Sequence, residues 1–267
     1  MEIYHKIQDA IDQSEPVALC TIVESRGSTP RHGGSKMLVY PGDDPGKFRI
    51  FGTVGGGEVE GRVIQEALQV LKDGKNRLLR YEMVDPRAGD PGVCGGQLEV
   101  YVEPILPKPC LVVIGGGHVG KAVAHLAHWL GFRVAVCDDR AEYCTAQENP
   151  DADEFYPVAM GDLPSHLRIT SSTYLVCTSR GAGVDIPGLP PLLDTQAAYI
   201  GVIGSRRRWA ITRQGLQEAG VSAEKINRIH SPVGLELNAE TPEEIAVSIL
   251  AEIIQVRNGG TGHSMKI

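Results

Sequence analysis

The feature that most constrains the fold of this chain is the stretch 111–120, LVVIGGGHVG. A β-branched, apolar run typical of a buried strand stops at a glycine turn, and a helical pattern follows directly. Gly115, Gly117 and Gly120 fit the pattern G-x-G-x-x-G, whose glycines allow a tight turn, close approach of a phosphate, and close packing of helix on strand. His118 falls inside the turn, where it would touch the phosphate. The turn therefore predicts an anion site at a helix N-terminus.

Beyond this turn the sequence alternates strands with helices, as a parallel sheet requires. Arg206 opens one further helix, and the last helix has Thr241 as N-cap, Pro242 at its first position and Glu244 at its third. The pattern predicts a Rossmann-like domain over residues 107–267. Its strands are expected at 111–114, 132–137, 154–157, 174–178 and 198–203, with its first helix at 118–130.

An acidic residue stands where a nucleotide-binding domain would use one. Asp138 follows Gly120 by 18 residues, close to the spacing at which a carboxylate accepts from a ribose 2′-OH. This favours NAD(P) or another nucleotide as ligand, and the alternative is a glycine turn that only packs. Binding does not imply hydride transfer, because a dehydrogenase also needs an acid or base at its substrate, and the sequence indicates none.

The first hundred residues predict a separate, mixed α/β domain over 1–106. Prolines at 104, 107 and 109 mark its end. Alternating apolar residues and turn signals predict strands, and apolar residues spaced at three and four predict a helix that opens at the glycine turn 55–57. A helix is expected at 3–13, and strands at 17–23, 37–40, 48–53, 77–84 and 97–103.

The glycine turn of this first region has two interpretations. Gly55, Gly56 and Gly57 would direct several backbone N–H groups at an anion, as a backbone nest does. Alternatively the turn is only tight, and Glu58 and Glu60 complement the dipole of the helix that follows. The spacing does not separate the two.

Basic residues flank the glycines in both regions. Arg26 and Lys36 in the first region, and Arg206 in the second, could hold an anion with paired hydrogen bonds. The alternative is a solvated run of charge, which we favour for Arg207 and Arg208.

Six cysteines occur without any C-x-x-C pair, so neither a disulfide framework nor a zinc site is indicated. Cys94 differs from the others because Gly95 and Gly96 follow it in a glycine-flanked turn. An uncrowded thiol there could be reactive or bind a soft metal, whereas the alternative is an inert loop cysteine. Cys144 lies in a polar connection, and the remaining cysteines indicate small core residues: Cys20, Cys110, Cys137 and Cys177.

Charge and hydropathy exclude several classes of protein. The net charge of −7 argues against nucleic-acid binding, which needs clustered basic residues. No apolar run approaches the roughly 20 residues of a membrane span, and the N-terminus lacks the basic and apolar regions of a signal peptide. We therefore expect a cytoplasmic protein with no membrane contact.

Several short motifs, in their order along residues 15–257, together resemble the XdhC–CoxI family of accessory proteins of molybdenum hydroxylases. The resemblance departs at Gly116, where alanine is usual, and at Ala182, where a histidine is often seen. The motifs that carry it are ESRGSTPR at 24–31, GTVGGG at 52–57 with Glu60, CGG at 94–96, GHVG at 117–120, DDR at 138–140, YIG at 199–201 with GSR at 204–206, and TPEEIA at 241–246.

The resemblance implies an N-terminal XdhC/CoxI domain followed by a Rossmann-like domain. Such proteins bind molybdenum cofactor, promote exchange of its oxo ligand for sulfur with a cysteine desulfurase, and deliver it to a xanthine dehydrogenase-type apoenzyme of purine catabolism. The chain would then be a maturation chaperone rather than a turnover enzyme, and a homodimer is the default assembly. The cofactor would be molybdopterin, either bare or in a dinucleotide form.

The resemblance also suggests roles for the residues above. The glycine turns suit a terminal phosphate, Arg26 and Lys36 could offset its charge, and Glu58 or Glu60 could accept from pterin N–H groups. Cys94 is the candidate to face molybdenum. Two alternatives remain, an NAD(P)-dependent oxidoreductase and a nucleotide-sensing regulator that binds protein.

Overall fold

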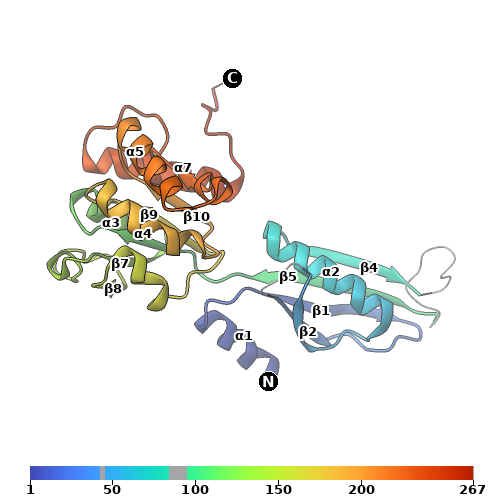
Figure 1. The fold of residues 1–267 in the computed structure, drawn as a ribbon. Coiled ribbons are helices and arrows are strands. Elements are labelled where there is room, and N and C mark those ends of the chain that lie inside the picture. The colour runs from blue at the N-terminus through green and yellow to red at the C-terminus, as the bar shows by residue number, and fades with distance from the viewer. Residues whose placement is uncertain (43–45, 84–94, 267) are drawn as a thin grey trace. The chain divides into compact units, whose positions relative to one another are not determined.

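The computed structural model describes residues 1–42, 46–83 and 95–266, and the chain forms two compact units, Met1–Pro107 and Lys108–Ile267 (Figure 1). The first unit is built on an antiparallel sheet and the second on a parallel one. The predicted fold class, a mixed α/β domain followed by a Rossmann-like domain, is confirmed.

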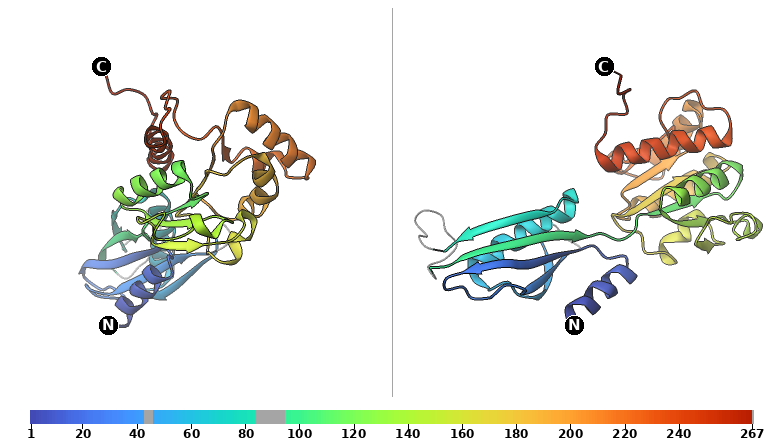
Figure 2. Two further views of the ribbon diagram at one scale, coloured as in Figure 1. Left: turned by 90° about the vertical axis from the view of Figure 1, so that its left-hand side faces the viewer. Right: turned by 180° about the vertical axis from the view of Figure 1, so that it is seen from behind.

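The first unit is a five-stranded sheet in the order β3-β2-β1-β5-β4, with a helix on each face (Figures 1 and 2). Alternation along β1 produces the two faces: Ala18 and Cys20 pack under α2, whereas Val17 and Leu19 pack under α1. The sequence pattern predicted each of these elements. They are α1 (Glu2–Asp12), β1 (Val17–Arg26), β2 (Lys36–Pro41), β3 (Phe48–Gly52), α2 (Gly57–Asp73), β4 (Arg77–Glu82) and β5 (Gln97–Ile105).

The second unit is a six-stranded parallel sheet in the order β11-β10-β9-β6-β7-β8. Helices α3 and α7 cover one face, and η3, α4, α5 and α6 cover the other. Its elements are β6 (Cys110–Ile114), α3 (His118–Trp129), β7 (Arg133–Cys137), η2 (Ala141–Tyr143), β8 (Glu154–Tyr156), η3 (Met160–Ser165), β9 (Thr173–Cys177), α4 (Ala182–Leu193), β10 (Tyr199–Val202), α5 (Arg206–Glu218), α6 (Ala223–Ile226), β11 (Ile229–His230) and α7 (Pro242–Asn258).

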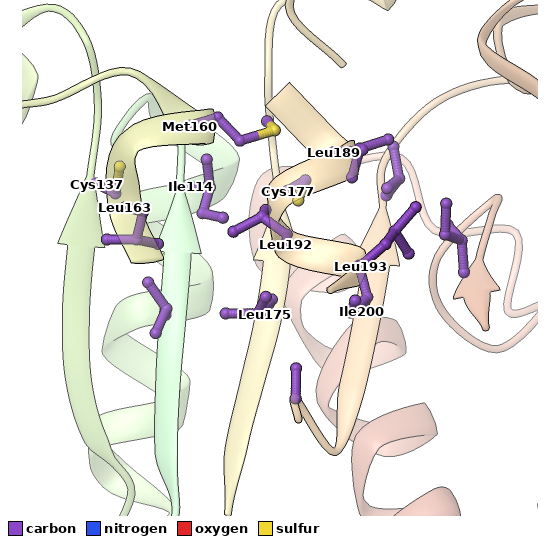
Figure 3. Packing of buried hydrophobic residues seen from close by; sticks show 14 of the residues in the cluster. Ile114, Cys137, Met160, Leu163, Leu175, Cys177, Leu189, Leu192, Leu193 and Ile200 are labelled. Atoms are coloured by element: carbon purple, nitrogen blue, oxygen red, sulfur yellow. The ribbon is translucent and has the colours of Figure 1, made fainter. Parts of the chain in front are cut away.

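Counted from β6, this is the strand order 3-2-1-4-5-6 of dinucleotide-binding domains. Strand β6 lies between β7 and β9, and Ile114 pairs with Cys137 on one side and with Cys177 on the other. The three strands therefore end at the same level. Figure 3 shows side chains of η3 and α4 packed over these strand ends. Ligands of open α/β sheets bind at such a switch point, at the carboxyl ends of the strands.

Helix α4 is an element that the sequence did not predict. It contains Pro187, Pro190 and Pro191, and proline inside a helix removes a hydrogen bond and clashes with the preceding turn. The helix forms because Leu189 and Leu192 are fully buried against the sheet, so tertiary packing outweighs local propensity.

Helix α7 begins with the predicted capping box. Thr241 accepts a hydrogen bond from the Glu244 N–H, and the Glu244 side chain accepts from the Thr241 N–H. We expect Thr241→Ala to lower the free energy of unfolding by about 1 kcal/mol, measured by denaturation of the full chain. Thr261→Ala, in the exposed C-terminal segment, is the control and should have no effect. Equal stabilities of the two variants would contradict the role of the cap.

Candidate functional site

The glycine turn of the second unit is closed on one side and open on the other. Gly115 has φ +116°, and a Cβ there would lie 2.7 Å from the Thr178 carbonyl oxygen. A Cβ on Gly120 would lie 1.9 Å from the Gly115 carbonyl oxygen. A Cβ on Gly117 would instead have no described atom within 4 Å, and no described side chain caps the start of α3. The turn therefore leaves its helix N-terminus open to an anion.

Two buried side chains hold the peptide groups of Gly116. Asp138, 4% exposed, accepts from the Gly116 N–H at 2.9 Å. Asn149, 1% exposed, donates to the Gly116 carbonyl at 3.4 Å and to the Tyr143 carbonyl at 2.7 Å. A Cβ on Gly116 would meet the Tyr143 carbonyl oxygen at 2.3 Å. The turn is thus fixed in position without any ligand.

Asp138 is also bound by an arginine. Its oxygens accept from the backbone N–H of Arg140 at 3.0 Å and from the guanidinium at 2.9 and 3.0 Å. Burial alone would raise the pKa of Asp138, but the hydrogen bonds from Arg140 and Gly116 outweigh it and hold the pKa below its ordinary value. A ribose hydroxyl would therefore have to share this carboxylate with Arg140, and the ribose contact of Asp138 stays a prediction.

A cavity of about 360 Å³ lies at the switch point. Its walls come from the segments that follow four parallel strands and from the first turns of α4. Its lining includes Gly115, Asp138–Arg140, Val158–Asp162, Thr178–Arg180, Gly183 and Gly188. A ligand anchored at the glycine turn would extend into this space.

Arg208 belongs to this region, contrary to the prediction of a solvated side chain. Its guanidinium contacts the Asp185 carboxylate at 2.7 Å and the Ser179 hydroxyl at 2.6 Å. Asp185 is fully buried, and a buried carboxylate needs a charged or hydrogen-bonded partner. Arg206, which the sequence favoured, is exposed at the start of α5, so its anion contact stays a prediction.

His118 lies in a different hollow. This groove of about 470 Å³ runs between α3 and the start of α7, and Lys121, His125 and Pro242 also line it. The lining of the cavity at the switch point does not include His118. The position of the His118 side chain therefore does not support the phosphate contact that the sequence suggested for it.

In the first unit the chain itself supplies an anion to the glycine turn. One carboxylate oxygen of Glu60 accepts from the N–H groups of Val54 and Gly56, both at 3.1 Å, and from the Thr53 hydroxyl. Gly55, Gly56 and Gly57 all have positive φ, as the nest interpretation requires. The turn therefore binds an anion, as the nest interpretation predicts. The anion is the Glu60 carboxylate at the start of α2, the helix that follows the turn.

Three motifs of the first unit meet around the loop 27–34. A Cβ on Gly27 would lie 2.9 Å from the Gly95 carbonyl oxygen, and one on Gly96 would lie 2.4 Å from the Ser28 carbonyl oxygen. A Cβ on Gly55 would meet the Pro30 ring at 3.3 Å. Backbone packs on backbone at Gly27 and Gly96, and a side chain packs on backbone at Gly55, which explains these glycines. Cys94 precedes Gly95 but lies outside the described residues.

The polar candidates of this unit have partners within the chain. Arg26 pairs with Glu24 at 2.7 Å, and Glu58 pairs with Arg62 at 2.6 Å, both on the surface. The Lys36 ammonium donates to the Thr21 hydroxyl at 3.3 Å. Exposed ion pairs are weak, so Arg26 and Glu58 can exchange partners at small cost. The cofactor contacts of Arg26, Glu58 and Lys36 stay predictions.

The five described cysteines are buried and free. Burial raises the pKa of Cys20 and Cys137 to about 12 and that of Cys110 to about 11, which keeps these thiols protonated and unreactive. The prediction of core cysteines is confirmed. Cys144, expected in a polar connection, is buried as well and donates to the Val136 carbonyl.

Residues 1–42, 46–83 and 95–266 contain no cluster of three or more His, Cys, Asp or Glu side chains arranged to hold a metal ion. Within the same ranges, none of the helices combines the length and the apolar character needed to cross a bilayer.

Comparison with known proteins identifies the family. The model of the XdhC Rossmann domain matches residues 111–253, and the model of the XdhC and CoxI family matches residues 10–82. The chain belongs to the XdhC and CoxI family and carries its Rossmann domain, as the sequence motifs suggested.

Three relatives differ in how much of their length the chain covers. It is 37% identical to the uncharacterized protein YqeB of Escherichia coli over 99% of this chain and 48% of YqeB. It is 34% identical to a probable xanthine dehydrogenase subunit of Bacillus subtilis over 59% of this chain and 46% of that protein. It is 26% identical to the molybdenum cofactor insertion chaperone PaoD of Escherichia coli over 93% of this chain and 86% of PaoD. The chain thus spans about half the length of YqeB.

A solved structure described as a xanthine dehydrogenase from Bacillus halodurans resembles the whole chain. The TM-score is 0.51 at 23% identity, over 98% of this chain and 97% of that one. This likeness supports the fold.

We expect Asp138→Asn to lower the free energy of unfolding of the second unit by about 2 kcal/mol at pH 7, because charge-assisted hydrogen bonds to Arg140 are lost. The folded-state pKa of Asp138 is depressed. Its contribution is therefore fully present above the unfolded pKa of about 3.9 and is lost as pH falls through the folded-state pKa. The difference between wild type and variant should shrink accordingly.

Denaturation followed by tryptophan fluorescence measures this, because both tryptophans, Trp129 and Trp209, lie in the second unit. Asp139→Asn, which removes a half-exposed carboxylate, is the control and should change stability by less than about 1 kcal/mol. A difference for Asp138→Asn that persists unchanged below pH 3 would contradict the argument.

Proposed function

We propose that this protein binds molybdenum cofactor, supports its sulfuration and inserts it into a xanthine dehydrogenase-type molybdenum hydroxylase. The observation that carries the proposal is the match, along 93% of the chain, to a molybdenum cofactor insertion chaperone. Its partners would be the apo-hydroxylase and a cysteine desulfurase. We further propose a cytoplasmic homodimer.

The chemistry of the cargo suits the second unit. Molybdopterin ends in a phosphate, and the open helix N-terminus at Gly117 offers uncapped N–H groups beside a cavity of about 360 Å³. That cavity supports a dinucleotide form of the cofactor, whose nucleotide would lie at the switch point.

The first unit carries the cysteine that we propose to act on molybdenum. The loop 27–34 contacts the backbone at Gly95 and Gly96, and Pro30 of the same loop contacts the turn at Gly55. The residues next to Cys94 therefore lie against this loop. The five described thiols are buried, which leaves Cys94 as the cysteine proposed to face molybdenum or its exchangeable sulfur. Since Glu60 holds its own turn, we assign the pterin N–H contacts to Glu58, whose exposed pair with Arg62 can open. Arg26 and Lys36 keep the proposed role of offsetting the negative charge of the cofactor.

Activation of an apo-hydroxylase tests the role of Cys94. At limiting accessory protein, Cys94→Ser should reduce activation roughly tenfold or more, as loss of an attacking or ligating thiolate does. Cys144→Ser is the matched control, because a serine hydroxyl can keep the hydrogen bond to the Val136 carbonyl. Activation unchanged in Cys94→Ser would remove Cys94 from the mechanism.

Cofactor binding tests the placement of the phosphate. Gly117→Val adds a side chain in open space, so the fold should survive while close approach of the phosphate is blocked. Affinity for molybdopterin should fall by about tenfold or more, the cost of one charge-assisted hydrogen bond. Gly61→Val, also next to open space but in α2, is the control. Equal affinities would place the phosphate elsewhere.

An NAD(P)-dependent oxidoreductase is the second candidate, favoured by the strand order of the second unit. Nicotinamide-dependent turnover of a small substrate by the purified chain would support it. Binding of nucleotide without pterin would instead support a nucleotide-sensing regulator.

A further inference from the structure

An ion pair joins two of the loops that form the cavity at the switch point. Nη2 of Arg180 lies 2.7 Å and 3.0 Å from the two carboxylate oxygens of Asp139. Asp139 follows β7 and Arg180 follows β9, and both line the cavity.

The sheet order places this pair across the glycine turn. Strand β6 lies between β7 and β9, and Ile114 pairs with the last residue of each. Strands β7 and β9 are therefore two inter-strand spacings apart, about 10 Å. A contact between the loops after β7 and β9 must therefore bridge the end of β6, where Gly115 begins the turn. The bridge therefore lies across the end of β6, beside the turn that leads into α3.

The bridge is weak enough for a ligand to open. The side chains of Arg180 and Asp139 are 48% and 47% exposed, and exposed pairs contribute little to stability. The buried pairs of the same site, Asp138 with Arg140 and Asp185 with Arg208, have carboxylates that are almost completely shielded. Of these three arginines, Arg180 is the one that solvent reaches most readily.

We propose that Arg180 is a phosphate-binding residue of this site and that Asp139 occupies it until a phosphate ester displaces the carboxylate. A guanidinium binds phosphate and carboxylate with the same planar set of donors, so the two acids compete for Arg180. The inference rests on the proposed function, because it takes the ligand to carry a phosphate or diphosphate at the glycine turn.

Two substitutions should have opposite effects on binding. Asp139→Asn removes the competing charge and should tighten binding of a nucleoside diphosphate by about two- to fivefold, the scale of an exposed ion pair. Arg180→Gln removes the phosphate partner and should weaken binding by about tenfold or more. Arg180→Lys keeps the charge without the planar donors and should give an intermediate affinity.

Calorimetric titration of the full chain with ADP, CDP and GDP measures these changes, and the nucleoside with the same base provides the phosphate-free comparison. Neither substitution should change nucleoside affinity. Glu148→Gln is the matched control, since it breaks a pair of similar exposure with Lys121 outside the cavity. It should leave every affinity unchanged.

The proposal would be supported if Asp139→Asn tightened and Arg180→Gln weakened the binding of nucleoside diphosphates while neither changed the affinity for nucleosides. Weaker binding in both variants, or no change in either, would overturn it, as would a wild-type chain that binds none of the three diphosphates. A chain that binds diphosphates in this way but carries no pterin would contradict the proposed function and leave the assignment of Arg180 intact.

Discussion

The hydrogen bond between the Asp138 carboxylate and the Gly116 N–H is the interaction that organises the glycine turn of the second unit. A glycine turn that opens a helix presents N–H groups without partners, and left alone it would be mobile. Asp138 holds one of them at 2.9 Å while Arg140 keeps the carboxylate charged. With that peptide fixed, no described side chain caps the start of α3, and a Cβ on Gly117 would meet no described atom within 4 Å. The site is therefore organised before any ligand arrives.

In the first unit, too, a carboxylate binds the backbone N–H groups of a glycine turn. Glu60 returns from the first turns of α2 to accept from the N–H groups of Val54 and Gly56. In both units a carboxylate of the chain thus binds part of a glycine turn. The difference lies in what remains: the second turn opens beside a cavity, whereas the first lies against the loop that contains Pro30.

Periodicity and turn chemistry predicted most of the fold, because they are local properties of the sequence. The alternation in β1 and the capping box at Thr241 are examples. The sequence did not predict helix α4 because its prolines disfavour a helix. The burial of Leu189 that stabilises the helix exists only in the folded sheet.

The site was predicted less completely. Glycine spacing located the turns, but the partners of Arg208 depend on an approach of side chains that no spacing rule contains. The partners of Glu60 do have a local signal, because the acid follows Gly56 of the glycine turn by four residues.

We have proposed that the chain carries a phosphorylated molybdenum–pterin cargo. The most direct test is to purify the full chain from molybdenum-replete cells and to measure molybdenum, released pterin and released nucleotide in the same sample. Molybdenum and pterin should be present in equal amounts, and both should be reduced together in Gly117→Val. A correctly folded wild-type chain that contains neither, and takes up neither from added cofactor, would contradict it.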